Sequence, residues 1–292
     1  MNRRSFLSSS LTLLSAALPA SAQRLPIKKA VLLSMLPNSL SIAERFQLAK
    51  DSGFAEIECG TTPDQSKAEE ILAASRKSSV RIHSVMNSDH WKFPLSSSDP
   101  AVVAKCVAGM ETSLKNAKVW GADTVLLVPA VVNPETSYQD AYTRSQREIR
   151  KMIPLAKESK VIIAVEEVWN KFLLSPIEFA RYVDEFDSPW VRAYFDVGNV
   201  VLYGYPQDWI RTLGKRIVKL HLKDFTFRRD PTIKKSIADW VNLRDGDIDW
   251  KAIHSALASI GYQGTATVEL SGGDAAYLKD VSHRVDQIFE GV

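Results

Sequence analysis

The sequence predicts an α/β fold, a (β/α)₈ barrel formed by a single domain. Eight apolar or β-branched runs of strand length alternate with segments of helical periodicity over about 260 residues. No linker, repeat or low-complexity segment divides the chain. Eight consecutive strand–helix units of this total length match a closed parallel barrel in size and order. A doubly wound open sheet is the alternative, but no glycine-rich phosphate loop follows any of the runs.

The predicted elements follow one another without a break. The eight predicted strands cover residues 30–36, 55–59, 80–85, 124–129, 161–168, 191–197, 217–225 and 265–270. Capping residues that begin helices are Ser39 or Ser41, Asp99 before Pro100, and Ser175 before Pro176. Glycines that end the helices predicted over 42–52, 102–120 and 250–260 are Gly53, Gly121 and Gly261.

The first 22 residues are set apart from the barrel by their composition. Arg3 and Arg4 give a basic start, residues 11–18 form an apolar stretch, and a small-residue cleavage site ends at Ala22. The apolar stretch is too short to span a bilayer, so it predicts a signal peptide. The paired arginines resemble a twin-arginine signal, which predicts export of a folded protein to the periplasm, with an ordinary Sec signal as the alternative. The barrel domain would then cover residues 23–292.

Charge and cysteine content exclude several classes of protein. The chain has 37 basic and 34 acidic residues. Residues 1–22 contain two of the arginines and no acid, so the predicted domain is nearly neutral. Without a basic block, neither a nucleic-acid partner nor stable membrane association is expected. Cys59 and Cys106 are the only cysteines, and their positions in a strand and a helix predict two buried side chains without a disulfide. The oligomeric state stays open, a homo-oligomer included.

Four ionisable residues lie at the ends of four consecutive predicted strands. Glu166 ends "VIIAVE", Asp196 ends "VRAYFD", His221 lies in "IVKLHLKD" and Glu269 lies in "TATVEL". The carboxyl ends of barrel strands form the rim where chemistry takes place. Each residue alone could be a solvated strand end or a satisfied core group, but four together predict a shared site. One histidine and three carboxylates suit one divalent ion: Mn²⁺ first, then Mg²⁺, Co²⁺ or Zn²⁺.

These motifs carry a resemblance to a known family. "FDVGN", "HLKD" and "TVEL", together with "VIIAVEEVWNKFLLSP" and "RDGDIDWKAIHSALASIGYQGTATVEL", resemble the sugar isomerase and epimerase TIM barrels of the xylose isomerase-like superfamily over about residues 30–290. The resemblance implies that Glu166, Asp196, His221 and Glu269 bind one divalent metal, and that the two glutamates also move protons. Glu166 would then point into the site. Because side chains alternate along a strand, Glu167 would take the opposite face.

One position departs from the family pattern. Epimerases of this kind commonly have a histidine three residues after the aspartate, whereas this chain has Asn199. Asparagine donates and accepts hydrogen bonds but carries no proton charge, which weakens the prediction of a plain ketose 3-epimerase. Further residues predicted to bind substrate, in addition to Asn199, are Lys223, His83, Glu58, Trp91, Arg244 and, in a loop, Asn133.

The predicted chemistry is proton abstraction next to a carbonyl through an enediolate. A divalent ion can stabilise the enediolate by several kcal/mol, while Glu166 and Glu269 act as general base and acid on opposite faces. Because the chain is predicted to be exported, we expect an unphosphorylated sugar as substrate. A lyase or dehydratase of a 3-keto sugar or glycoside is the alternative. A metal-dependent endonuclease and a non-catalytic sugar-binding barrel are weaker alternatives, because histidines are few and the ligand set is complete.

Overall fold

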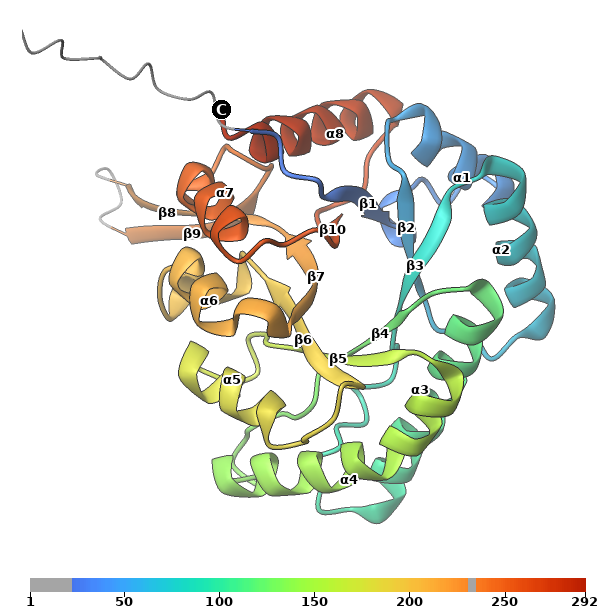
Figure 1. Cartoon of the computed structure of the whole chain (residues 1–292), viewed down its shortest axis with the longest axis vertical. Coiled ribbons are helices and arrows are strands. Elements are labelled where there is room, and N and C mark those ends of the chain that lie inside the picture. The colour runs from blue at the N-terminus through green and yellow to red at the C-terminus, as the bar shows by residue number, and fades with distance from the viewer. Residues whose placement is uncertain (1–22, 231–234) are drawn as a thin grey trace, which may run out of the picture.

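The computed structural model describes residues 23–230 and 235–292, and it contains the predicted closed barrel in a single domain (Figure 1). The eight barrel strands are parallel and are ordered β1-β10-β7-β6-β5-β4-β3-β2 around the ring. They are β1 (Lys28–Leu32), β2 (Glu56–Gly60), β3 (Arg81–Met86), β4 (Thr124–Leu127), β5 (Ile162–Glu166), β6 (Val191–Asp196), β7 (Ile217–Leu222) and β10 (Thr265–Val268). The predicted signal peptide at residues 1–22 lies outside the described residues.

Eight α-helices surround the barrel in the part of the chain that the structure describes. They are α1 (Ile42–Asp51), α2 (Gln65–Ser78), α3 (Pro100–Trp120), α4 (Tyr138–Ser159), α5 (Pro176–Asp184), α6 (Pro206–Leu213), α7 (Trp250–Ser259) and α8 (Ala275–Glu290). Ser41 begins α1 with a capping box that it forms with Glu44, and Gly121 ends α3 at a φ of 72°. Short 3₁₀ segments cover Leu33–Met35, Asn199–Leu202 and Gly214–Arg216. Across the described part of the chain, no helix combines the length and apolarity needed to cross a membrane.

A β-hairpin between β7 and α7 corrects the prediction of one strand over residues 217–225. The barrel strand β7 ends at Leu222, and β8 (Asp224–Asp230) then pairs antiparallel with β9 (Lys235–Val241). Figure 1 shows this hairpin outside the ring of strands, beside α6 and α7. The carboxylate of Asp224 accepts the N–H of Arg244 at 2.7 Å and the indole N–H of Trp250 at 2.9 Å. These bonds fix the point where the chain leaves the barrel.

Replacing Asp224 with alanine should lower the free energy of unfolding by roughly 2–4 kcal/mol, because it leaves several buried N–H groups without an acceptor. The carboxylate also accepts the backbone N–H of Phe225 at 2.8 Å. Chemical denaturation measures the change. The neighbouring Asp245→Ala is the control, since that side chain is 53% exposed and its ion pair with Arg284 contributes about 0–1 kcal/mol. Equal effects of the two substitutions would contradict the assigned role of Asp224.

The main apolar core lies between the strands and the helices, and it contains Cys59 and Cys106 as free, buried thiols, as predicted. The inside of the barrel is more polar. Tyr194 donates its hydroxyl proton to Glu58, and the Thr267 hydroxyl lies 2.9 Å from Nε2 of His83. This buried polar layer lies directly beneath the strand ends that carry the candidate site.

Candidate metal centre

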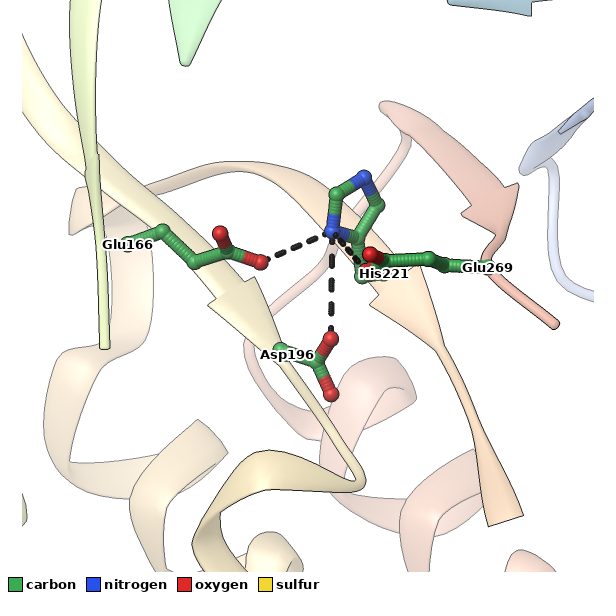
Figure 2. A group of neighbouring side chains, drawn as sticks. All are labelled: Glu166, Asp196, His221 and Glu269. Atoms are coloured by element: carbon green, nitrogen blue, oxygen red, sulfur yellow. Dashed lines mark hydrogen bonds and ion pairs between the residues drawn. The ribbon is translucent and has the colours of Figure 1, made fainter. Parts of the chain in front are cut away.

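Four neighbouring strands bring Glu166, Asp196, His221 and Glu269 together (Figure 2). One ligand atom from each residue lies within 4.8 Å of all the others. The register pairs Asp196 on β6 with His221 on β7, and the backbone N–H of Glu269 donates to Leu222 at the end of β7. Within residues 23–230 and 235–292, this is the one group of three or more such side chains that could hold an ion.

His221 directs one ring nitrogen at the three carboxylates. Its Nδ1 lies 2.8 Å from Glu166, 3.0 Å from Glu269 and 3.8 Å from Asp196, as the dashed lines in Figure 2 show. On the other side of the ring, Nε2 lies 3.4 Å from Oε1 of Glu58. A carboxylate behind the distal nitrogen of a histidine fixes the orientation of the ring and favours metal binding by the nitrogen that faces the site. Nδ1 is therefore the ring nitrogen placed to bind an ion at this candidate site.

Two protein cations, the buried His221 and the largely buried Lys223, partly balance the carboxylates. Burial lowers the pKa of His221, but the carboxylates of Glu269, Glu58 and Glu166 outweigh it and hold the pKa well above its usual value. The ammonium of Lys223 lies 3.0 Å from Asp196 and 2.9 Å from Glu269. Burial lowers the pKa of Lys223, whereas these two carboxylates raise it more strongly. The site thus concentrates negative charge that a divalent cation can neutralise, and its oxygen and imidazole donors fit Mn²⁺ or a similar ion.

Metal affinity is expected to fall as the pH drops from 8 to 6, because the ion must displace protons from Glu166 and from His221, whose pKa values are both raised. Burial raises the pKa of Glu166 to about 7, and the opposing attraction of His221 only partly offsets it. A ligand must lose its proton before it binds a metal, so protonation below that pKa competes with the ion. Equilibrium dialysis with Mn²⁺ at pH 8, 7 and 6 should show a loss of up to about tenfold per pH unit for each displaced proton. Affinity independent of pH would contradict this prediction, and Glu166→Gln should show the smaller slope.

The structure places two predicted substrate-binding residues beneath the metal centre. Glu58 and His83 are fully buried in the barrel, where Glu58 contacts His221 and Tyr194. Burial, followed by the positive charge of Lys219, lowers the pKa of His83 well below its usual value. Glu58 therefore orients His221, and His83 belongs to the polar interior of the barrel.

Asn199 and Lys223 lie in the site together. Oδ1 of Asn199 accepts from the Lys223 ammonium at 3.3 Å, and its amide nitrogen donates to the Glu167 carbonyl at 2.9 Å. Asn199 thus positions a cation at the rim, which a protonated histidine at the same place would repel.

Of the loop residues predicted to bind substrate, Arg244 and Asn133 make contacts away from the four candidate ligands, and Trp91 is exposed to solvent. Arg244 is exposed and donates to Gln287 on α8, so its guanidinium is directed toward the outer helix. The exposed Asn133 accepts the N–H of Glu135 within its own turn. Trp91 is 54% exposed in the loop after β3, and its role in substrate binding stays a prediction.

One residue beside the site, His90, escaped the sequence-based prediction, and Glu167 was predicted only to face away from it. His90, next to Trp91, is buried, and burial lowers its pKa to about 4 although Glu269 acts in the opposite direction. Its Nδ1 accepts the N–H of Val128 at 3.2 Å, so the neutral ring carries its proton on Nε2. Glu167 faces away from the ligand group, as the alternation predicts, and accepts the N–H of Asp196 at 2.9 Å. In the sequence, the only indication of this role for Glu167 was the pair of adjacent glutamates at the end of an apolar strand.

Comparison with known proteins identifies the family of the chain. The family model of the xylose isomerase-like TIM barrel matches residues 46–287. L-ribulose-5-phosphate 3-epimerase UlaE of Escherichia coli is 27% identical over 250 residues, which cover 80% of this chain and 84% of that protein. The structure of 3-keto-D-glucoside 4-epimerase YcjR of E. coli has a TM-score of 0.73 at 15% identity, over 90% of this chain and 98% of that one.

A third comparison concerns the metal. A xylose isomerase-like TIM barrel protein from Mycobacterium smegmatis, solved in complex with magnesium, has a TM-score of 0.69 at 17% identity over 93% of this chain and 98% of that one. At these identities the solved structures show the fold. The family model covers most of the chain, which therefore belongs to the xylose isomerase-like TIM barrel family. Its curated relatives are named sugar epimerases, so the predicted class of enzyme, a sugar isomerase or epimerase, is confirmed.

Proposed function

We propose that this protein is a divalent-metal-dependent isomerase or epimerase of an unphosphorylated sugar. The observation that carries the proposal is the group of Glu166, Asp196, His221 and the partly exposed Glu269, with ligand atoms within 4.8 Å of one another. Mn²⁺ is the proposed ion, with Mg²⁺, Co²⁺ or Zn²⁺ as alternatives, and a bound ion would stabilise the negative charge that develops on substrate oxygen. Glu166 and Glu269 take the proton from the carbon next to the carbonyl and return it.

The cations of the site favour a substrate without a phosphate group. Lys223 is already paired with Asp196 and Glu269. Arg244, the other cation predicted to hold substrate, is directed to Gln287 on α8. A phosphate site would instead present uncommitted Arg or Lys side chains, or the N–H groups of a helix start, to the ligand. The curated relative UlaE is named for a sugar phosphate, so this point separates the present chain from that enzyme.

Elimination from a 3-keto sugar or glycoside is the second candidate. Asn199 favours it, because the position cannot supply the proton charge that a histidine would. Elimination starts with the same removal of a proton beside a carbonyl, so the two glutamates would keep their roles. The two candidates differ in the product, since only elimination expels a hydroxyl group or an alcohol.

A substrate panel tests the proposal. The Mn²⁺-loaded protein is incubated with free ketoses, their phosphate esters and 3-keto-glycosides in deuterated water, and products are followed by NMR. We expect deuterium next to the carbonyl of an unphosphorylated substrate. Isomerised sugar supports the first candidate, and an unsaturated product supports the second. A preference for a phosphate ester by orders of magnitude would overturn the proposed substrate class.

Export through a twin-arginine signal is part of the proposal. Arg3 and Arg4 should both be needed, because that route reads the paired arginines. Replacing both with lysine should retain the full-length protein in the cytoplasm of the producing cells, as cell fractionation would show. Arg24→Lys, just beyond the predicted cleavage site, is the control. Export of the doubly substituted chain at the parental level would exclude the twin-arginine route.

A further inference from the structure

We propose that four aromatic residues beside the metal centre bind the second ring of a glycoside substrate, whether that ring is a sugar or an aromatic group. The residues are Trp169, Phe225, Phe227 and Trp240, which we call the aromatic wall. The proposal rests on the proposed function, because it names the class of unphosphorylated sugar on which that site would act.

The aromatic wall has a buried centre and exposed outer faces. Trp169 and Trp240 stack with ring centroids 4.8 Å apart and an angle of 24° between their planes. Phe225, which is 3% exposed, meets both tryptophans edge to face at 5.4 and 4.9 Å. Trp169 is 40% exposed, Trp240 38% and Phe227 46%. Large aromatic surfaces left in water close to a polar site are typical of ligand contacts.

Lys223 connects the aromatic wall to the metal centre. Its ammonium lies 5.3 Å from the centroid of the Trp240 ring and 2.9 Å from the carboxylate of Glu269. A single side chain therefore separates Trp240 from a metal ligand. A substrate ring bound at the carboxylates would have its substituent on the Trp240 side within reach of the exposed part of the indole, the rest of which is covered by Trp169 and Lys223.

Both tryptophans are held in place by residues adjoining the metal ligands. Trp169 follows Glu166 by three residues, and its indole N–H donates to the Asn199 carbonyl at 2.8 Å. Gly198, two residues after Asp196, makes room for Trp240: a Cβ at Gly198 would lie 3.0 Å from the ring of Trp240 and 2.7 Å from Cβ of Lys223. The wall is thus a fixed part of the site rim, which reduces the entropic cost of binding a ring.

The wall continues through Phe225 and Phe227 into a cleft of 510 Å³. The side chains with polar groups that line this cleft are Tyr205, Gln207, Asp247 and Asp249. Apolar rings beside a few amide and carboxylate groups suit a sugar, whose C–H face packs on an aromatic ring while its hydroxyls donate to oxygen acceptors. A monosaccharide held at the metal centre would leave this surface in water, whereas a glycoside would cover part of it.

Matched glucosides test the inference. Methyl β-D-glucopyranoside, phenyl β-D-glucopyranoside and cellobiose share one sugar ring and differ only in what it carries. Titration calorimetry with the Mn²⁺-loaded protein should show binding of the phenyl glucoside or cellobiose about tenfold tighter than binding of the methyl glucoside, the size of one aromatic stacking contact. The phenyl and cellobiose arms distinguish an aromatic second ring from a sugar.

Substitutions then locate the effect. Trp240→Ala should reduce the preference to within about twofold while Mn²⁺ stoichiometry stays unchanged, and Trp240→Phe should restore part of the preference. Ile177→Ala is the control, because it removes a side chain that is 75% exposed on α5. Equal affinities for the three glucosides, no binding of any of them, or a preference that survives Trp240→Ala would each overturn the inference.

The outcome stays separate from the test of the proposed function. Metal-dependent deuterium exchange on a free ketose, together with equal affinities for the three glucosides, would support the proposed enzyme activity. The same result would exclude the aromatic wall as a glycoside-binding surface. A Trp240-dependent preference for the phenyl glucoside or cellobiose, without any proton exchange in the substrate panel, would support the aromatic wall as a binding surface. It would exclude the proposed proton-transfer chemistry.

Discussion

Replacing Glu166 or Glu269 with glutamine is expected to slow proton exchange beside the substrate carbonyl by a factor of about 10² to 10⁴. The amide keeps the size of the carboxylate but cannot take a proton from carbon. Both glutamates lie within 3.0 Å of Nδ1 of His221, so both reach the centre of the site. Each substitution also removes one charged metal ligand, and exchange should therefore be measured at saturating Mn²⁺.

Deuterium incorporation followed by NMR gives the exchange rate for each variant. Glu148→Gln is the matched control, because Glu148 is also buried but lies on α4, where Arg147 and Lys151 pair with it. Its exchange rate should equal that of the parent protein. If the Glu166 and Glu269 variants both exchange at the parental rate, the two glutamates are not the acid and base.

Replacing His221 with alanine is expected to weaken Mn²⁺ binding by more than about 100-fold, because even residues that only orient a ligand contribute 10- to 100-fold to metal affinity. Glu58→Gln alters the carboxylate that lies behind His221. This variant should weaken Mn²⁺ binding by the smaller factor of about 10 to 100. Equilibrium dialysis measures both. His254→Ala is the control, since His254 lies on α7 and its Nε2 contacts the carbonyl of Gln23 at 3.2 Å. Parental affinity in His221→Ala would exclude the histidine as a ligand.

The sequence predicted the barrel and the ligand group because both depend on local periodicity. Apolar runs marked each barrel strand, and alternation along β5 separated Glu166 from Glu167. Parallel neighbouring strands must place their carboxyl ends at one rim, so residues far apart in the chain could be brought together without knowledge of their contacts.

The features that escaped prediction depend on contacts between distant segments. The turn at Asp224 requires N–H groups from Arg244, before α7, and from Trp250, the first residue of α7, which lie 20 and 26 residues later. The ring of His90 accepts a hydrogen bond from the backbone N–H of Val128. No local sequence pattern reveals this contact between distant segments. Arg244 was predicted to reach substrate, but its contact with Gln287 on α8 is set by how the loop packs on the outer helix. The aromatic wall likewise forms only when the hairpin packs beside the loop after β5.

The most direct test of the central claim is anomalous diffraction from crystals of the protein grown with Mn²⁺. We predict one manganese peak at bonding distance from Glu166, Asp196, Nδ1 of His221 and Glu269, with Lys223 and Glu58 outside the coordination sphere. An anomalous map without a peak between these four side chains, or with its peak at another place, would contradict the assignment of this group as the metal centre.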